Sequence, residues 1–403
     1  MTGSKGIDRG AEDMISGRWN RSRTRRTGEG ESPLKVAWPA VVGKEQPTRT
    51  RRVAMVGPSA DMAKLGGVAA VERVLLDEWR VSRYALDHVA THEDAGPGRR
   101  LAVALRAGRA LFGGFLARSI DLLHLHFVSR GSFWRKSGIV LLARLFGVPV
   151  VGHLHPCDFQ GFYEGLGPLR RAYVRMVLNS FDRIIVLTDE WRNWLVRLYR
   201  RSEPVILPDP VAVPAMVRRE RQGPPVLLTY GRFGANKGTY DILRAIPTVL
   251  ERFPDAQFWI GGDSEVDARV REMIKDESWA GRVRLIGWVS GTEKEAALVA
   301  AHAFLMPAHG NGLPMAVLEA MAWGVPVVAT PVRGLTSAVV DGETGLVVPV
   351  GDSQALAGAI VRLLKDPDRA ETLGMAGRQM IAERHEAGLI LERLEVVYDE
   401  VAG

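Results

Sequence analysis

Short apolar stretches alternate with helical patterns along most of the chain, and the alternation stops and restarts at one proline-rich break. The break, Pro204–Pro210, is expected to be a rigid linker. Strands are expected before it at 53–56, 122–126, 149–153 and 183–187, and after it at 226–230, 257–260, 283–286, 304–306, 325–329 and 346–348. Apolar strands that alternate with helices form parallel sheets covered on both faces. The pattern therefore predicts an α/β protein with two doubly wound, Rossmann-like domains in tandem.

The helical patterns between these strands set the expected domain boundaries. They lie near 68–79, 98–118, 137–146, 166–180, 238–253, 265–276, 291–301, 314–323, 353–365 and 368–383. We predict a first domain over 51–208, a second over 209–385, and a C-terminal helix over 386–403 that returns to the first domain. Residues 1–50 are polar and rich in arginine, so we expect a disordered basic tail there.

Composition indicates a soluble globular protein. The 403 residues are 46% hydrophobic and 25% charged, which suffices for two cores of ordinary size. The single cysteine, Cys157, excludes an intrachain disulfide and fits a reducing compartment. The longest apolar stretch, Ile139–Val151, is interrupted and too short to span a bilayer, and residues 1–50 have no apolar segment of the kind found in secretion signals. These features predict a cytoplasmic protein.

The net charge of +7 is unevenly distributed along the chain. Residues 1–50 carry +4, residues 51–210 carry +8 and residues 211–403 carry −5. The first domain is therefore expected to meet something anionic, such as a membrane surface, a lipid phosphate or a nucleic acid. No nucleic acid is expected as a partner, because the basic residues are not accompanied by aromatic residues that would stack on bases or by a known nucleic-acid-binding motif.

Two glycine-bearing loops lie between a strand and the helix that follows it. The first contains Gly66 and Gly67, which let the backbone approach a ligand beside the free N–H groups of a helix start; a plain glycine turn is the competing interpretation. The second begins at Gly231 and contains Arg232 and Lys237, two cations that are able to converge on a diphosphate. The alternative for that pair is two solvated loop cations.

A third motif precedes and opens another helix. It runs from Gly310 to Ala322, and Pro314 suits the first helical position because its missing N–H costs nothing there. Glu319 lies more than one turn into this helix among apolar neighbours, so we expect it to be partly buried and to need a partner. The hydroxyl groups of a nucleotide are one such partner, and a surface Glu on an amphipathic helix is the alternative.

Together these motifs, with Pro331–Gly334 and Asp341–Val347, resemble the family four retaining glycosyltransferases over about residues 52–385, most closely over 226–350. The resemblance implies a GT-B fold, in which two Rossmann-like domains face a central cleft, and a nucleotide diphosphate sugar as donor. It implies contacts from Arg232 and Lys237 to the diphosphate and from Glu319 to the ribose. The other donor-binding residues that it implies are Gly66, Gly67, Gly231, Gly287, Trp288, Val289, Gly312, Leu313, Pro314 and Met315.

The chain departs from the family pattern at two positions. The family usually has two glutamates eight residues apart, but Asn311 stands where the first is expected. Asn311 is able to hydrogen-bond a sugar but carries no charge, so an altered donor sugar is one interpretation and a non-catalytic nucleotide-sugar-binding protein is another. Asp209 stands in the linker where the family commonly has Asn.

Three segments of the first domain resemble a subset of the family that builds exopolysaccharides. They are Leu122–Phe127, Gly131–Lys136 and His153–Phe159. The resemblance implies that His155 ends a strand and contacts the reacting sugar. Arg135 and Lys136 precede another expected helix and are able to hold a lipid phosphate, and together with Asp158 they are the expected contacts of a glycan or lipid-linked acceptor.

The two His-x-His pairs in these segments also raise the question of a metal. Strand alternation puts both members of a pair on one face. No cysteine or carboxylate at ligand spacing completes a ligand set in the sequence, and the resemblance implies neither a cofactor nor a protein-bound metal. One histidine of each pair is expected to be a packed strand residue.

The resemblance further implies that the leaving phosphate takes the acceptor proton on the same face of the sugar, with Arg232, Lys237 and a helix start stabilising its charge. A nucleotide-sugar epimerase of the same fold is the competing reaction class, and would need no separate acceptor.

The stretch 98–118 combines arginines with large apolar residues. Its residues of these kinds are Arg99, Arg100, Arg106, Arg109, Arg118, Leu101, Leu105, Leu111, Phe112, Phe115 and Leu116. Such a pattern suits the headgroup region of an anionic membrane. We therefore expect peripheral association at the inner face of the cell membrane; the alternative is that the apolar residues are core and the arginines are solvated.

Overall fold

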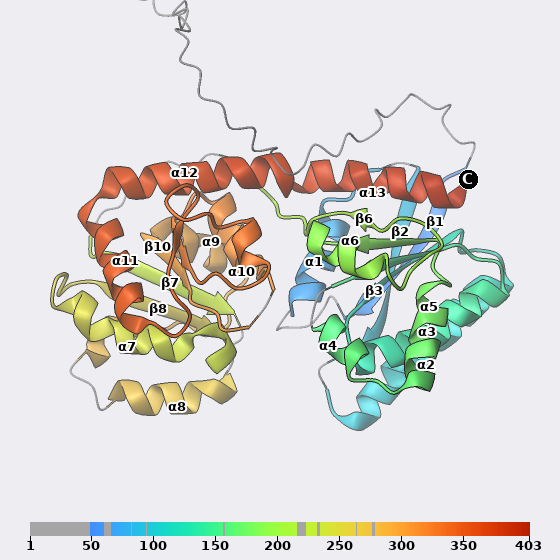
Figure 1. Cartoon of the computed structure of the whole chain (residues 1–403), viewed down its shortest axis with the longest axis horizontal. Coiled ribbons are helices and arrows are strands. Elements are labelled where there is room, and N and C mark those ends of the chain that lie inside the picture. Colours follow the sequence, from blue (N-terminus) through green and yellow to red (C-terminus); the bar gives the residue numbers. More distant parts are fainter. Residues whose placement is uncertain are drawn as a thin grey trace, which may run out of the picture. The chain divides into compact units, whose positions relative to one another are not determined.

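The computed structural model describes residues 49–59, 66–81, 83–93, 95–155, 158–215, 223–231, 234–262, 264–275, 279–310 and 312–403 (Figure 1). All but the last two residues of the tail predicted over 1–50 lie outside this set. The described residues belong to one compact unit, which contains two parallel six-stranded sheets. The expected pair of doubly wound α/β domains is confirmed.

The first sheet has the strand order β2-β1-β3-β4-β5-β6. Its strands are β1 (Arg51–Pro58), β2 (Tyr84–His92), β3 (Leu122–Phe127), β4 (Val150–Leu154), β5 (Arg183–Val186) and β6 (Val205–Ile206). Its helices are α1 (Gly67–Asp77), α2 (Pro97–Leu116), α3 (Gly131–Leu145), α4 (Phe159–Glu164), α5 (Pro168–Leu178) and α6 (Asp189–Leu195). Strand β6 falls inside the proline-rich segment expected to be only a linker, because Val205 and Ile206 pair with β5.

The second sheet has the order β12-β11-β10-β7-β8-β9. Its strands are β7 (Val226–Gly231), β8 (Gln257–Gly262), β9 (Val283–Leu285), β10 (Ala303–Met306), β11 (Val327–Ala329) and β12 (Leu346–Val347). The accompanying helices are α7 (Thr239–Leu250), α8 (Ser264–Lys275), α9 (Gly291–Ala300), α10 (Met315–Ala322), α11 (Ser353–Lys365) and α12 (Pro367–Arg384), with short 3-10 turns η1 (Ala235–Lys237), η2 (Ala280–Arg282) and η3 (Leu335–Ser337). These bounds lie close to the ranges expected from the sequence.

The strand orders locate where each sheet is able to bind a ligand. In doubly wound sheets, ligands bind beyond the carboxyl ends of the strands where the direction of winding reverses. In the second sheet this point lies between β7 and β10, and in the first it lies between β1 and β3. The loops that leave these four strands are therefore the expected ligand-binding loops.

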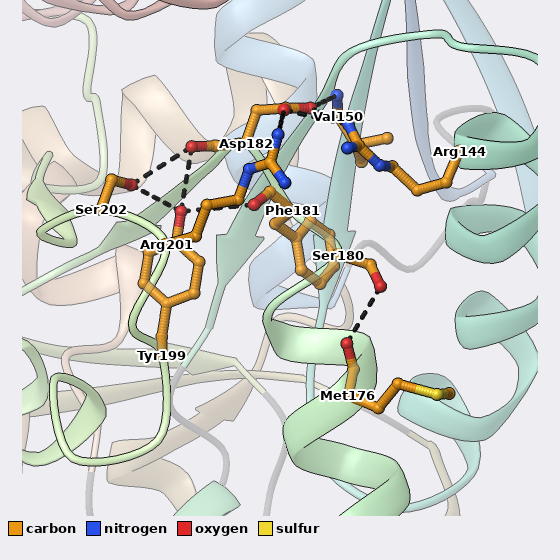
Figure 2. A network of polar contacts seen from close by, with 9 residues as sticks. All are labelled: Arg144, Val150, Met176, Ser180, Phe181, Asp182, Tyr199, Arg201 and Ser202. Atoms are coloured by element: carbon orange, nitrogen blue, oxygen red, sulfur yellow. Dashed lines mark hydrogen bonds and ion pairs between the residues drawn. The ribbon is translucent and has the colours of Figure 1, made fainter.

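The opposite, amino ends of β4 and β5 are joined by a polar network around Asp182 (Figure 2). Its carboxylate accepts hydrogen bonds from Arg144 Nη1 at 3.0 Å, from Arg201 Nη2 at 2.6 Å and from the backbone N–H of Val150 at 2.8 Å. The hydroxyl of Tyr199 donates to the backbone carbonyl of Asp182 at 2.9 Å. One carboxylate thereby fixes the start of two neighbouring strands.

The last helix, α13 (Ala387–Ala402), contacts the first sheet although it follows the second in the chain (Figure 1). Arg83 pairs with Glu395 and Asp399, and the hydroxyl of Tyr84 donates to Asp399 at 2.8 Å. Just before it starts, Glu386 forms a β-bridge with Val211, the residue that follows the linker. Among the helices described, none combines the length and apolar character needed to cross a membrane.

Candidate active site

The loop after β7 contains a glycine that cannot be replaced without strain. Gly238 has φ 70°, and a Cβ there would lie 1.9 Å from the carbonyl oxygen of Pro307. Gly231, with φ 135°, ends β7. Lys237 is half-buried, and its backbone N–H donates to Gly234 at 3.0 Å. Its expected partner Arg232 lies outside the described residues.

The loop after β10 packs directly against this β7 loop. The backbone N–H groups of His309 and Gly310 both donate to the carbonyl of Asn236, at 3.0 and 3.2 Å. His309 Nε2 also contacts the carboxylate of Asp241, which is buried on α7. The segment that holds Lys237 and the segment that leads into α10 are therefore adjacent, at the point where the sheet reverses its winding.

The turn into α10 depends on close backbone packing. Gly312 has φ 130° and donates its N–H to Arg333 at 2.7 Å, and a Cβ on Gly334 would lie 2.7 Å from its carbonyl carbon. Pro314 is the residue that precedes the first helical residue, Met315, so it caps the helix instead of occupying its first turn. Gly312, Leu313 and Pro314 are half-buried and Met315 is buried. Asn311 lies outside the described residues.

Glu319 on α10 is half-buried, as its neighbours predicted, but its partners come from the protein. Oε2 accepts from the hydroxyl of Tyr230 at 2.7 Å, and Oε1 accepts from Lys294 Nζ at 2.8 Å. Burial, followed by the charge and hydrogen bond of Glu319, raises the pKa of Tyr230 well above its usual value. Because each carboxylate oxygen has a second lone pair, Glu319 keeps acceptor capacity for a ligand.

Sequence reasoning did not identify Tyr230 and Lys294 as part of this arrangement. Tyr230 is the penultimate residue of β7 and Lys294 lies on α9, so three elements meet at one carboxylate. The segment Gly287–Val289 follows β9; Gly287 is exposed with φ 67°, and Trp288 and Val289 are half-buried.

In the first domain, Gly66 caps α1 and Gly67 begins it. No atom of the described residues would lie within 4 Å of a Cβ on Gly67. Helix α1 is also in contact with α10. Residues 60–65, which precede Gly66, lie outside the described residues.

His155 follows the last residue of β4 and is only 4% exposed. Its Nε2 lies 2.9 Å from Nδ1 of His126, and its Nδ1 lies 3.6 Å from the Asp209 carboxylate. Burial is the main cause that holds its pKa well below the usual value. The carboxylate that was not found at ligand spacing in the sequence is thus supplied by the linker, at Asp209.

The three residues expected to meet an acceptor phosphate have different surroundings. Lys136 is 4% exposed, and its Nζ donates to the backbone carbonyl of His126, so it lies in the interior. Arg135 is exposed; partial burial and then the nearby charge of Arg100 lower its pKa. Asp158 precedes α4 with φ 51° and lies 3.8 Å from Arg130.

Two families match consecutive parts of the chain. Residues 40–210 match the family described as "Glycosyl transferase 4-like domain", and residues 224–366 match "Glycosyl transferases group 1". Among solved structures, sucrose-phosphate synthase from Thermosynechococcus elongatus has 21% identity and a TM-score of 0.68, covering 87% of this chain and 98% of that one. Anabaena Alr3699/HepE in complex with UDP-glucose has 16% identity and a TM-score of 0.67, covering 87% and 99%. These structures have the GT-B fold.

Curated relatives cover much of the same region. The D-inositol 3-phosphate glycosyltransferase of Corynebacterium diphtheriae is 30% identical over 73% of this chain and 75% of its own length. The phosphatidyl-myo-inositol mannosyltransferase of Mycolicibacterium smegmatis is 30% identical over 70% of this chain and 72% of its own. Glycogen synthase of Mycobacterium tuberculosis is 28% identical over 60% of this chain, and the match spans 61% of that enzyme's length. The chain therefore belongs to the group 1 glycosyltransferases and has their GT-B fold.

Proposed function

We propose that this protein transfers a sugar from a nucleotide diphosphate sugar to a glycan or lipid-linked acceptor in polysaccharide biosynthesis, with retention of configuration at the anomeric carbon. The observation that carries the proposal is the packing of the Lys237 loop against the segment that opens α10, where the second sheet reverses its winding. A donor diphosphate at this point meets a lysine, backbone N–H groups and a helix start. The related HepE structure contains UDP-glucose, which supports this class of donor.

In this proposal the protein acts mainly on the charge of the leaving group. Lys237, together with Arg232 and the start of α10, stabilises the negative charge that develops on the diphosphate. The leaving phosphate accepts the proton of the acceptor hydroxyl on the face from which it departs. Glu319 binds the ribose with the lone pairs that Tyr230 and Lys294 leave available. This chemistry needs neither a cofactor nor a metal bound by the protein.

The other residues around the donor complete its site. Gly66, Gly67, Gly231 and Gly312 allow the backbone to approach the donor, and Gly287, Trp288 and Val289 lie beside the base. Leu313, Pro314 and Met315 face the donor sugar, together with Asn311. In the first domain His155 contacts the reacting sugar.

A membrane-associated acceptor is supported by the surface of the first domain. Helix α3 contacts both α2 and α5 (Figure 1). Helix α2 contains four Lys or Arg residues and α3 and α5 contain three each, and none of the three helices contains Asp or Glu. On α2, Leu101, Leu105, Phe112 and Leu116 are 48–66% exposed, whereas Leu111 and Phe115 are buried. Of the six large apolar residues in this stretch, only Leu111 and Phe115 therefore belong to the hydrophobic core.

The exposed apolar residues continue onto the neighbouring helices. Leu145 on α3 and Leu169 on α5 are 79% and 88% exposed, and a groove of about 530 Å³ between these helices is lined by Trp134, Ser137, Leu169, Arg170 and Tyr173. An apolar surface rimmed by cations suits anionic lipid. By its name, the M. smegmatis relative acts on phosphatidyl-myo-inositol, a lipid. We infer a cytoplasmic enzyme that works at the inner membrane face.

The test is a transfer assay with UDP-, GDP- and dTDP-sugars, with and without isolated membranes as the source of acceptor. Sugar should pass into the lipid fraction only when both donor and membranes are present, and NMR of the product should show the anomeric configuration of the donor. Donor conversion that is independent of any acceptor would favour the epimerase. Binding of the nucleotide sugar without turnover would favour the non-catalytic protein.

Substitutions test the assigned residues. Lys237→Ala should lower transfer by about two orders of magnitude through lost stabilisation of the leaving group, whereas the exposed Lys275→Ala should not. Glu319→Gln should weaken nucleotide binding without changing the pH profile of transfer, and the exposed Glu371→Gln is its control. Full activity of Lys237→Ala would show that the diphosphate does not bind at this loop.

A further inference from the structure

Four histidines form one buried cluster on a single face of the first sheet. His124 and His126 come from β3, and His153 and His155 come from β4 and its end. Their rings are stacked, with neighbouring centroids 4.5–5.5 Å apart, and all four residues are at most 4% exposed. Period-2 alternation brings both members of each pair to this face, as the sequence pattern predicted.

The cluster contains more polar atoms than its described surroundings satisfy. Buried atoms without a hydrogen-bond partner among the described residues are His124 Nε2, His126 Nε2, His153 Nδ1, His153 Nε2 and Asp209 Oδ1. A buried polar atom left without a partner costs about 1–3 kcal/mol, and native proteins contain few of them. Five such atoms in one place require partners, and the two candidates are a bound ion and ordered water.

The remaining contacts orient two of these nitrogen atoms as metal ligands. Asp209 Oδ1 lies 3.6 Å from His155 Nδ1, which is too far for a hydrogen bond, but the nearby acceptor oxygen favours the proton of His155 on Nδ1 over Nε2. His155 Nε2 then accepts from His126 Nδ1 at 2.9 Å, and the Nε2 of His126 keeps its lone pair. On the other side, His124 Nδ1 lies 2.6 Å from the Tyr398 hydroxyl oxygen, and when Nδ1–H donates to that oxygen the lone pair of His124 is on Nε2.

A metal-binding histidine commonly has its second ring nitrogen held by a hydrogen bond of this kind. We propose that His124, His126 and His153 bind a divalent transition-metal ion of the zinc type, inside the first domain. His155 and Asp209 orient His126, and Tyr398 orients His124. The site ties two strands, the linker and α13 together, so its role is structural.

The distances and the chemistry of the ligands both fit this ion. The ligand atoms of the three histidines lie within 4.8 Å of one another, and those of His153, His155 and Asp209 do so as well. Zinc–nitrogen bonds of about 2.0–2.1 Å require nitrogen atoms roughly 3.3 Å apart in a tetrahedral site. The His153 ring supplies the adjustment, because no described group holds either of its nitrogen atoms.

The type of ligand favours a transition metal over a hard cation. Neutral imidazole is the preferred ligand of zinc, copper and nickel, whereas calcium and magnesium prefer oxygen.

The experiment uses the untagged full-length protein purified without chelator. Mass spectrometry of the metal content should find one zinc ion per chain. After removal of that ion, Co²⁺ should restore one equivalent with the visible absorption of a tetrahedral site, and Zn²⁺ should raise the melting temperature. Protein that contains no metal and binds neither Zn²⁺ nor Co²⁺ would overturn the proposal, and would indicate that ordered water fills the cluster.

Variants locate the ion within the chain. His153→Asn should abolish binding, and His88→Asn, on β2 beside Glu72, should retain it. Tyr398→Phe keeps every ligand and should weaken binding about 10–100-fold, which tests the site even where His153→Asn fails to fold. Unchanged affinity in both His153→Asn and Tyr398→Phe would place the metal elsewhere and refute the assignment.

Discussion

The apolar stripe on α2 permits a quantitative prediction about membrane binding. Leu101, Leu105, Phe112 and Leu116 recur at spacings of four, seven and four residues, so they share one side of the helix. Their exposed fractions are 61, 60, 48 and 66%. Replacing all four with Gln removes this stripe, keeps the arginines and preserves good helix formers at each position.

The expected loss follows from the area that is still exposed. Complete burial of a Leu or Phe side chain is worth about 1.5–3 kcal/mol, and roughly half of that area remains available on each residue. Insertion of the four side chains should thus contribute about 4 kcal/mol, or roughly three orders of magnitude in the partition coefficient. Because the residues are exposed, the melting temperature should change little.

Co-sedimentation with vesicles measures both contributions. Wild-type protein should bind vesicles containing phosphatidylglycerol and release them as salt rises, because surface charges are screened over about 10 Å at 0.1 M. The quadruple variant should lose most of this binding. A matched control replaces Val340, Val350 and Met375 of the second domain, which are 40–46% exposed, and should bind normally. Equal binding by the quadruple variant and wild type would refute the reasoning, and weak binding by wild type to all vesicles would favour a soluble acceptor.

Three further substitutions test packing and charge. Asp182→Ala removes two ion pairs and a hydrogen bond to β4, and should lower stability by about 2–3 kcal/mol; an unchanged thermal midpoint would contradict the role of this network. Gly238→Ala, which forces a Cβ against Pro307, should lower both the melting temperature and nucleotide affinity, and wild-type affinity would show that the loop is free to move. Burial raises the pKa of Glu72, so the folded state binds its proton more tightly than the unfolded state does. The stability gained from that proton is complete below about pH 4.5 and is lost as pH rises. Above pH 4.5 the stability of Glu72→Gln relative to wild type should therefore increase, by at most about 1.4 kcal/mol per pH unit, as measured by melting curves. A difference that does not change with pH would contradict this.

The sequence was most informative where strands are buried on both faces. The strands of the second sheet are short apolar runs, and their expected and observed bounds differ by no more than two residues. Strand β2 was missed because it lies at a sheet edge and contains Asp87, His88 and His92, which break the apolar pattern. Helices α4 and α6 were missed because six or seven residues are too few to show a helical period.

Contacts between distant segments were beyond the reach of sequence patterns. Lys136 was interpreted as a phosphate ligand from its neighbours in the chain, but its position on α3 turns it inward to the carbonyl of His126. The partners of Glu319 come from a strand 89 residues and a helix 25 residues away. Asp209 meets His155 only because the linker returns to the end of β4.

The two faces of the first sheet differ in a way that follows from alternation within single strands. In β3, Leu123, Leu125 and Phe127 pack into one apolar cluster, while Leu122 belongs to another and leads to His124 and His126 on the same face. The apolar face is covered by side chains that water cannot reach, so it serves stability. The other face changes from apolar to polar toward the carboxyl end of the strand, and it is met there by Tyr398 of α13. Hydrogen-bonding groups concentrated at the carboxyl end of a parallel sheet are expected where ligands bind. The order Leu-Leu-His-Leu-His-Phe therefore separates a structural face from a binding face within six residues.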